Sequence, residues 1–144
     1  DGWTALHNAV HNGHTDIILA LLEGGADVGA RSNVGRDGVL VLKNGNTALH
    51  LAAFNGNADV VKLLLAPSTI VKDVNSDGST DGADVRKGVD VDAKNTRGNT
   101  ALHEAAANGH MDVVLYLLDR NADIEAVNSV RFDNISSVQW ISAF

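Results

Sequence analysis

The sequence predicts an all-α repeat solenoid, in which pairs of short helices stack side by side. The motif Thr-Ala-Leu-His occurs three times, beginning at Thr4, Thr47 and Thr100, and Asn-Gly follows each of these threonines by eight residues. Hydrophobic residues recur at helical spacing within and after each motif. Helix pairs of this kind cannot bury a hydrophobic face alone, so they become stable by stacking on further copies.

The first helix of the first repeat is expected to begin after Thr4, whose hydroxyl can accept a hydrogen bond from a free backbone N–H. Leu6, Ala9 and Val10 fall on one face of that helix and form its predicted core side. Asn12 and Gly13 end the helix, because glycine readily adopts the left-handed conformation that helix ends prefer.

The second helix carries Asp16 in its first turn, where a negative charge interacts favourably with the helix dipole. Residues 24–27, Gly-Gly-Ala-Asp, then turn the chain out into an extended finger. The predicted core side of this helix consists of Ile17, Ile18, Leu21 and Leu22.

The same pattern predicts one array over residues 1–144. The helices of the second and third repeats are expected at residues 47–55, 58–66, 100–108 and 111–119. Leu6, Leu49 and Leu102 should pack between neighbouring repeats. The repeats cover about residues 1–31, 44–94 and 97–127, with a degenerate partial repeat at 133–144.

These motifs resemble those of ankyrin-repeat proteins, although Ala replaces the proline of the usual Thr-Pro-Leu-His. The resemblance implies β-hairpin fingers and a concave face that binds another protein. It also implies that His7, His50 and His103 hydrogen-bond backbone between neighbouring repeats, which we favour over a metal-binding or catalytic role.

By the same resemblance, Trp3 and Phe54 lie on the concave face. Exposed aromatic side chains are common binding hot spots, and the alternative for both is simple packing. The expected partner-binding residues are Trp3, His11, Asn46, Phe54, Asn99 and Ala107.

Two insertions interrupt the repeat period. The motif glycines Gly2, Gly45 and Gly98 are 43 and 53 residues apart, whereas the ankyrin period is about 33. The first insertion, at residues 32–44, combines turn residues with a short β-branched run and predicts a lengthened hairpin finger. The second, at residues 67–86, follows a helix end and is expected to bulge out without disturbing the stack.

The second insertion contains Asp-Val-Asn-Ser-Asp-Gly at residues 73–78, which resembles the calcium loop of EF-hands and, more closely, of dockerins. Calcium binds six to eight oxygen atoms, and glycine at Gly78 permits the sharp turn that gathers them. In this mapping Ser79 contributes its backbone carbonyl. The six expected calcium ligands are Asp73, Asn75, Asp77, Ser79, Asp81 and Asp84.

Two features depart from the calcium-loop pattern. Thr80 stands where an apolar residue is usual, and the sequence has no second intact loop to pair with the first. The alternative is a solvated linker, since Asp, Asn, Ser and Gly favour turns. Four carboxylates within twelve residues repel one another without a cation, so we favour calcium.

Composition excludes several functions. A net charge of −7 disfavours nucleic acid, and no apolar run is long enough to cross a membrane. No catalytic set, phosphate loop or dinucleotide motif occurs, so we expect no enzyme activity.

We expect a monomeric fragment of a longer array, because no polar capping repeat is visible. Localisation stays open.

The expected function is therefore a protein–protein interaction module that carries a calcium-binding loop. The alternative is a calcium-responsive regulatory or recruiting segment of a larger multidomain protein or enzyme.

Overall fold

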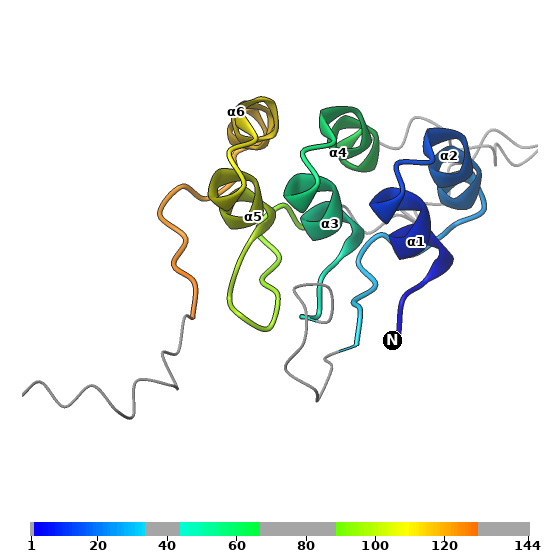
Figure 1. Cartoon of the computed structure of the whole chain (residues 1–144), viewed down its shortest axis with the longest axis horizontal. Coiled ribbons are helices and arrows are strands. Elements are labelled where there is room, and N and C mark those ends of the chain that lie inside the picture. The colour runs from blue at the N-terminus through cyan, green and yellow to red at the C-terminus, as the bar shows by residue number, and fades with distance from the viewer. Residues whose placement is uncertain (1, 34–43, 67–88, 130–144) are drawn as a thin grey trace, which may run out of the picture.

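The computed structural model describes residues 2–33, 44–66 and 89–129, which contain three pairs of antiparallel helices (Figure 1). We call α1, α3 and α5 the inner helices and α2, α4 and α6 the outer helices, since each set forms its own row in Figure 1. The helices are α1 (Ala5–His11), α2 (Thr15–Glu23), α3 (Ala48–Phe54), α4 (Ala58–Leu65), α5 (Ala101–Ala107) and α6 (Met111–Asp119).

Each inner helix begins with a reciprocal threonine–histidine cap. In α1 the Thr4 hydroxyl accepts from the His7 backbone N–H at 3.3 Å, and His7 Nδ1 accepts from the Thr4 backbone N–H at 3.2 Å. The same cap occurs at Thr47 and at Thr100. Capping satisfies backbone donors that the helix itself cannot, which explains why all three inner helices begin one residue after a threonine.

The same histidines join neighbouring repeats. Because Nδ1 accepts a hydrogen bond, the proton lies on Nε2, which donates to the next repeat. The Nε2 of His7 lies 3.0 Å from the carbonyl oxygen of Asn46, and the Nε2 of His50 lies 2.9 Å from that of Asn99. These contacts confirm the bridging role expected for His7 and His50.

Small side chains let the inner helices pack closely around α3. Ala52 and Ala53 are fully buried, and Leu49 and Leu51 are each 1% exposed. α3 contacts both α1 and α5, so it is covered on two sides. The central repeat is therefore the best-buried part of the described stack.

Three of the predicted core residues, Ile17, Leu21 and Leu102, are less buried than expected. Ile17 is 51% exposed, although Val60 and Val113 at the same repeat position are fully buried. Leu102 is half-buried, whereas Leu6 and Leu49 are enclosed. The reason is that the first and third repeats lie at the two ends of the described stack. In the described residues, no further repeat covers the free side of either one.

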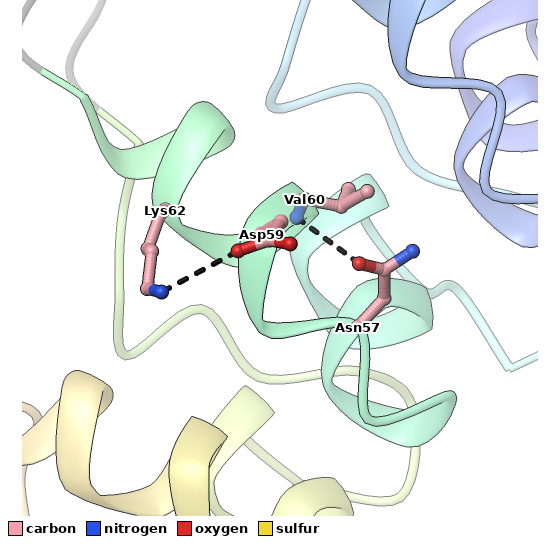
Figure 2. Close-up of polar contacts among 4 residues, drawn as sticks. All are labelled: Asn57, Asp59, Val60 and Lys62. Atoms are coloured by element: carbon pink, nitrogen blue, oxygen red, sulfur yellow. Dashed lines mark hydrogen bonds and ion pairs between the residues drawn. The ribbon is translucent and has the colours of Figure 1, made fainter.

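Between the inner and outer helix of each repeat, glycine makes the turn. Gly56 has a φ of +70°, and a Cβ added there would meet the ring of His110. Asn57 caps the start of the outer helix α4, and its Oδ1 accepts from the Val60 N–H at 3.2 Å (Figure 2). His110 occupies the equivalent position in the third repeat. Its side chain does not cap α6, and its Nε2 lies 3.0 Å from the Phe54 carbonyl of the preceding repeat.

No β-strand occurs in the described residues, so the predicted hairpin fingers are not seen there. The finger before α5 closes with a tight turn in which the Asn95 N–H donates to the Asn99 carbonyl and the Gly98 N–H to that of Asn95. Two of its other backbone groups bond to neighbouring fingers: the Thr96 N–H donates to the Asn44 carbonyl, and the Arg97 carbonyl accepts from the Ser129 N–H, each at 2.8 Å. In the described part of this finger, the bond from the Asn95 N–H to the Asn99 carbonyl is the backbone bond that joins the two limbs, and one such bond does not make a strand pair.

Replacing Leu49 with alanine should lower the free energy of unfolding by about 2–5 kcal/mol, because a buried leucine leaves a cavity when truncated. Leu115→Ala is the matched control, since that side chain is 59% exposed and its loss should cost less than about 0.5 kcal/mol. Urea unfolding measures both variants. Equal losses would contradict the placement of Leu49 in the core.

Stability should also fall as the pH drops below the ordinary histidine pKa. Burial lowers the pKa of His7 and of His50, and the carbonyls that they contact oppose this shift only in part. The unfolded chain therefore binds protons first as the pH falls through about 6.5, and the folded state loses stability progressively toward the lowered pKa values. Above that pH both states hold neutral histidines.

Urea midpoints at pH 7.5, 6.5 and 5.5 measure this dependence. The double variant His7→Gln, His50→Gln should be less stable at pH 7.5 and show a flatter pH profile across the same range. A wild-type midpoint that stays constant or rises on acidification would contradict the burial of neutral histidines.

Candidate binding surface

The inner helices present a row of equivalent residues across the stack. His11, Phe54 and Ala107 are the last residues of α1, α3 and α5. His11 and Ala107 are exposed and Phe54 is half-buried. We call this row, with Trp3, the inner face. Four of the six expected partner-binding residues therefore belong to this row, and of these Trp3 and His11 are in contact.

Side-chain-to-backbone hydrogen bonds hold this row in register. The Asn55 side-chain amide donates to the His11 carbonyl at 3.1 Å, and His110 contacts the Phe54 carbonyl. Each of these bonds joins the end of one inner helix to the following repeat. His11 and Phe54 therefore lie at helix ends that are hydrogen-bonded to the following repeat, whereas Trp3 lies in the segment before α1.

Trp3 lies beside α1 and is half-buried. Its ring lies edge-on to the ring of His11, with centroids 5.2 Å apart, and 6.3 Å from that of His7. The two interpretations of Trp3 are therefore compatible, because one part of the ring packs on α1 while another part is exposed.

The inner helices are almost free of charge. Their three sequences contain one charged residue, Glu104, which is 7% exposed. The described charges near this surface lie instead on the fingers, including Arg31, Lys94 and Arg97. Contact with the inner helices would thus depend on apolar and hydrogen-bonding groups.

The two remaining expected contact residues belong to a buried polar network at the base of the fingers. Asn46 is 3% exposed, and its Oδ1 accepts from the Asn95 side-chain amide at 2.8 Å. Asn99 is half-buried and donates to Glu104 Oε1 at 3.0 Å. Asn46 therefore faces the interior, where Asn95 satisfies its side-chain oxygen.

Asn95 is the centre of this network, and the sequence interpretation missed it. Its side-chain amide also donates to Glu104 at 3.1 Å, while its Oδ1 accepts from the Arg97 and Asn99 backbone N–H groups at 3.0 Å each. Asn128 at the equivalent position of the next finger donates to Asn99 Oδ1 at 2.9 Å. Asparagine recurring at one finger position was the available signal.

The expected calcium ligands all lie outside the described residues, as do most of both insertions and the degenerate repeat at 133–144. Within the described ranges, no group of three or more His, Cys, Asp or Glu side chains could hold a metal ion. The same part of the chain has no helix long and apolar enough to cross a membrane.

Comparison with known proteins agrees with the helix pairs. The family model for ankyrin repeats in three copies matches residues 1–78 and 33–128. No curated protein matches the chain. Because the matched ranges cover most of the sequence and coincide with the three stacked helix pairs, the chain belongs to the ankyrin-repeat family.

Proposed function

We propose that this protein is a protein–protein interaction module that binds its partner through the inner face. The observation that carries this proposal is an uncharged row of exposed or half-exposed side chains on a hydrogen-bonded stack. Ankyrin repeats suggest binding to another protein, and they are generally non-enzymatic. We propose no catalytic role for the described residues.

Rigidity supports this function. A surface that is ordered before binding loses little conformational entropy when the partner docks. Trp3 and Phe54 supply the large side chains, and the neighbouring Ala107 leaves room for a partner group in the third repeat. The first insertion, as a lengthened hairpin finger, would extend the same surface.

Affinity capture from an extract, quantified by mass spectrometry, tests the inner face. The double variant Trp3→Ala, Phe54→Ala should retain less than about one tenth of the wild-type partner, because truncated hot spots typically cost 2 kcal/mol or more. The control Ile17→Ala, Met111→Ala removes exposed apolar side chains from outer helices instead. Equal capture by both double variants, with unchanged melting temperatures, would contradict the proposal.

We also propose that the second insertion binds calcium and gives the module a calcium-responsive element. Support comes from the sequence alone: oxygen-bearing residues at alternate positions 73, 75 and 77, with a glycine at 78 and an aspartate at 84. Such a segment would serve as the regulatory or recruiting part of a larger protein or enzyme. A single loop should bind weakly, at about 10⁻⁴–10⁻³ M.

Calorimetric titration with calcium tests the second proposal. Asp73→Ala, Asp77→Ala should abolish the binding heat, whereas Asp16→Ala, Glu23→Ala, which removes two carboxylates from α2, should leave it unchanged. Partner capture with calcium and with chelator then distinguishes a regulatory ion from a structural one. Equal heats in all three proteins would rule out the loop as the site.

A further inference from the structure

The outer helices α4 and α6 enclose a groove that plays no part in the proposed inner-face function. The groove has a volume of about 580 Å³ and is largely open to solvent. In Figure 1 the two helices lie next to each other in the outer row. The lining residues are Ala58, Asp59 and Lys62 from α4 and Asp112, Leu115, Tyr116 and Asp119 from α6.

Three of these residues form one stripe along α6. Asp112, Leu115 and Asp119 have the spacing i, i+3 and i+7, which places them on the same helix face. At a rise of 1.5 Å per residue, the two carboxylates are separated by about 10 Å along the helix axis. An apolar side chain thus lies between two acidic ones.

Stacking of the repeats does not require an apolar residue at the position of Leu115. This residue occupies the repeat position of Lys62, which points outward from α4. A leucine that is 59% exposed at this outward position, beside a half-buried Tyr116, gives the groove an apolar centre.

The acidic residues of the stripe are available for a cationic partner. The Nζ of Lys62 already pairs with the Oδ1 of Asp59 in its own helix, at 3.4 Å (Figure 2). Arg120, the other nearby cation, donates to the Tyr116 hydroxyl at 2.6 Å and to the Leu65 carbonyl at 2.9 Å. No ion pair involves Asp112 or Asp119 within the part of the chain that is described.

We propose that this groove binds a basic amphipathic helix of another protein. A lysine or arginine at each end of a two-turn segment would pair with Asp112 and Asp119, and an apolar residue between them would cover Leu115. Complementary charge and spacing carry this proposal, which stands whether or not the inner face binds a partner. Phosphate-rich partners would be repelled by the same carboxylates.

A fluorescein-labelled peptide of lysine and leucine, (LKKLLKL) repeated twice, is the probe, and fluorescence anisotropy measures its binding to the full chain. The variant D112N/D119N should bind at least about tenfold more weakly, and Leu115→Gln should also weaken binding. Affinity for the wild type should fall between about 0.05 and 0.3 M salt, as expected for charge pairing at a surface.

The first repeat offers a matched control, because Asp16 and Glu23 of α2 occupy the repeat positions of Asp112 and Asp119 but do not line the groove. The variant D16N/E23Q should bind within about twofold of the wild type. A peptide with glutamate in place of lysine should not bind. The proposal is overturned if both double variants weaken binding equally, if neither does, or if the glutamate peptide binds as well as the lysine peptide.

Discussion

The described structure depends on the contact between one repeat and the next. Each helix pair is too thin to enclose its own apolar side chains, so a repeat is buried by its neighbours rather than by itself. The capping histidines add directionality, because His7 and His50 satisfy a helix start on one side and a carbonyl of the following repeat on the other. Local folding of the helix start and stacking are thereby coupled through the same imidazole ring.

Contacts between the fingers continue this coupling below the helices. Arg31 donates to the Lys94 carbonyl, and Lys94, at the same finger position, donates to the Val127 carbonyl at 3.1 Å. Asn95 of the same finger donates to Glu104 of α5 at 3.1 Å. The buried Glu104 carboxylate is tolerated because the side-chain amides of Asn95 and Asn99 donate to its Oε1.

Charge is divided between the two helix rows. The inner helices expose none, whereas the outer helices carry Asp16, Glu23, Asp59, Asp112 and Asp119 against a single lysine, Lys62. The inner row suits contacts made by shape and hydrogen bonds, while the outer row favours cationic groups. Two partners of different chemistry could therefore bind the same stack without competing.

The sequence by itself determined the three helix pairs of the described residues and where each of their inner helices begins. These features follow from local chemistry, since a threonine cap followed by a paired histidine acts within one turn. It also indicated that Leu6 and Leu49 are buried. The insertions could be located from the repeat period, although their conformation lies outside the described residues.

Only the tertiary structure decided which copies of a repeated position are buried. Ile17 and Val60 are equivalent in sequence, yet one is half exposed and the other is enclosed, because burial depends on whether a neighbour covers that side. The same reasoning places Asn46 inside a polar network and assembles the groove from residues of α4 and α6. Repetition in the sequence specifies a unit, whereas the environment of each unit is set by its place in the stack.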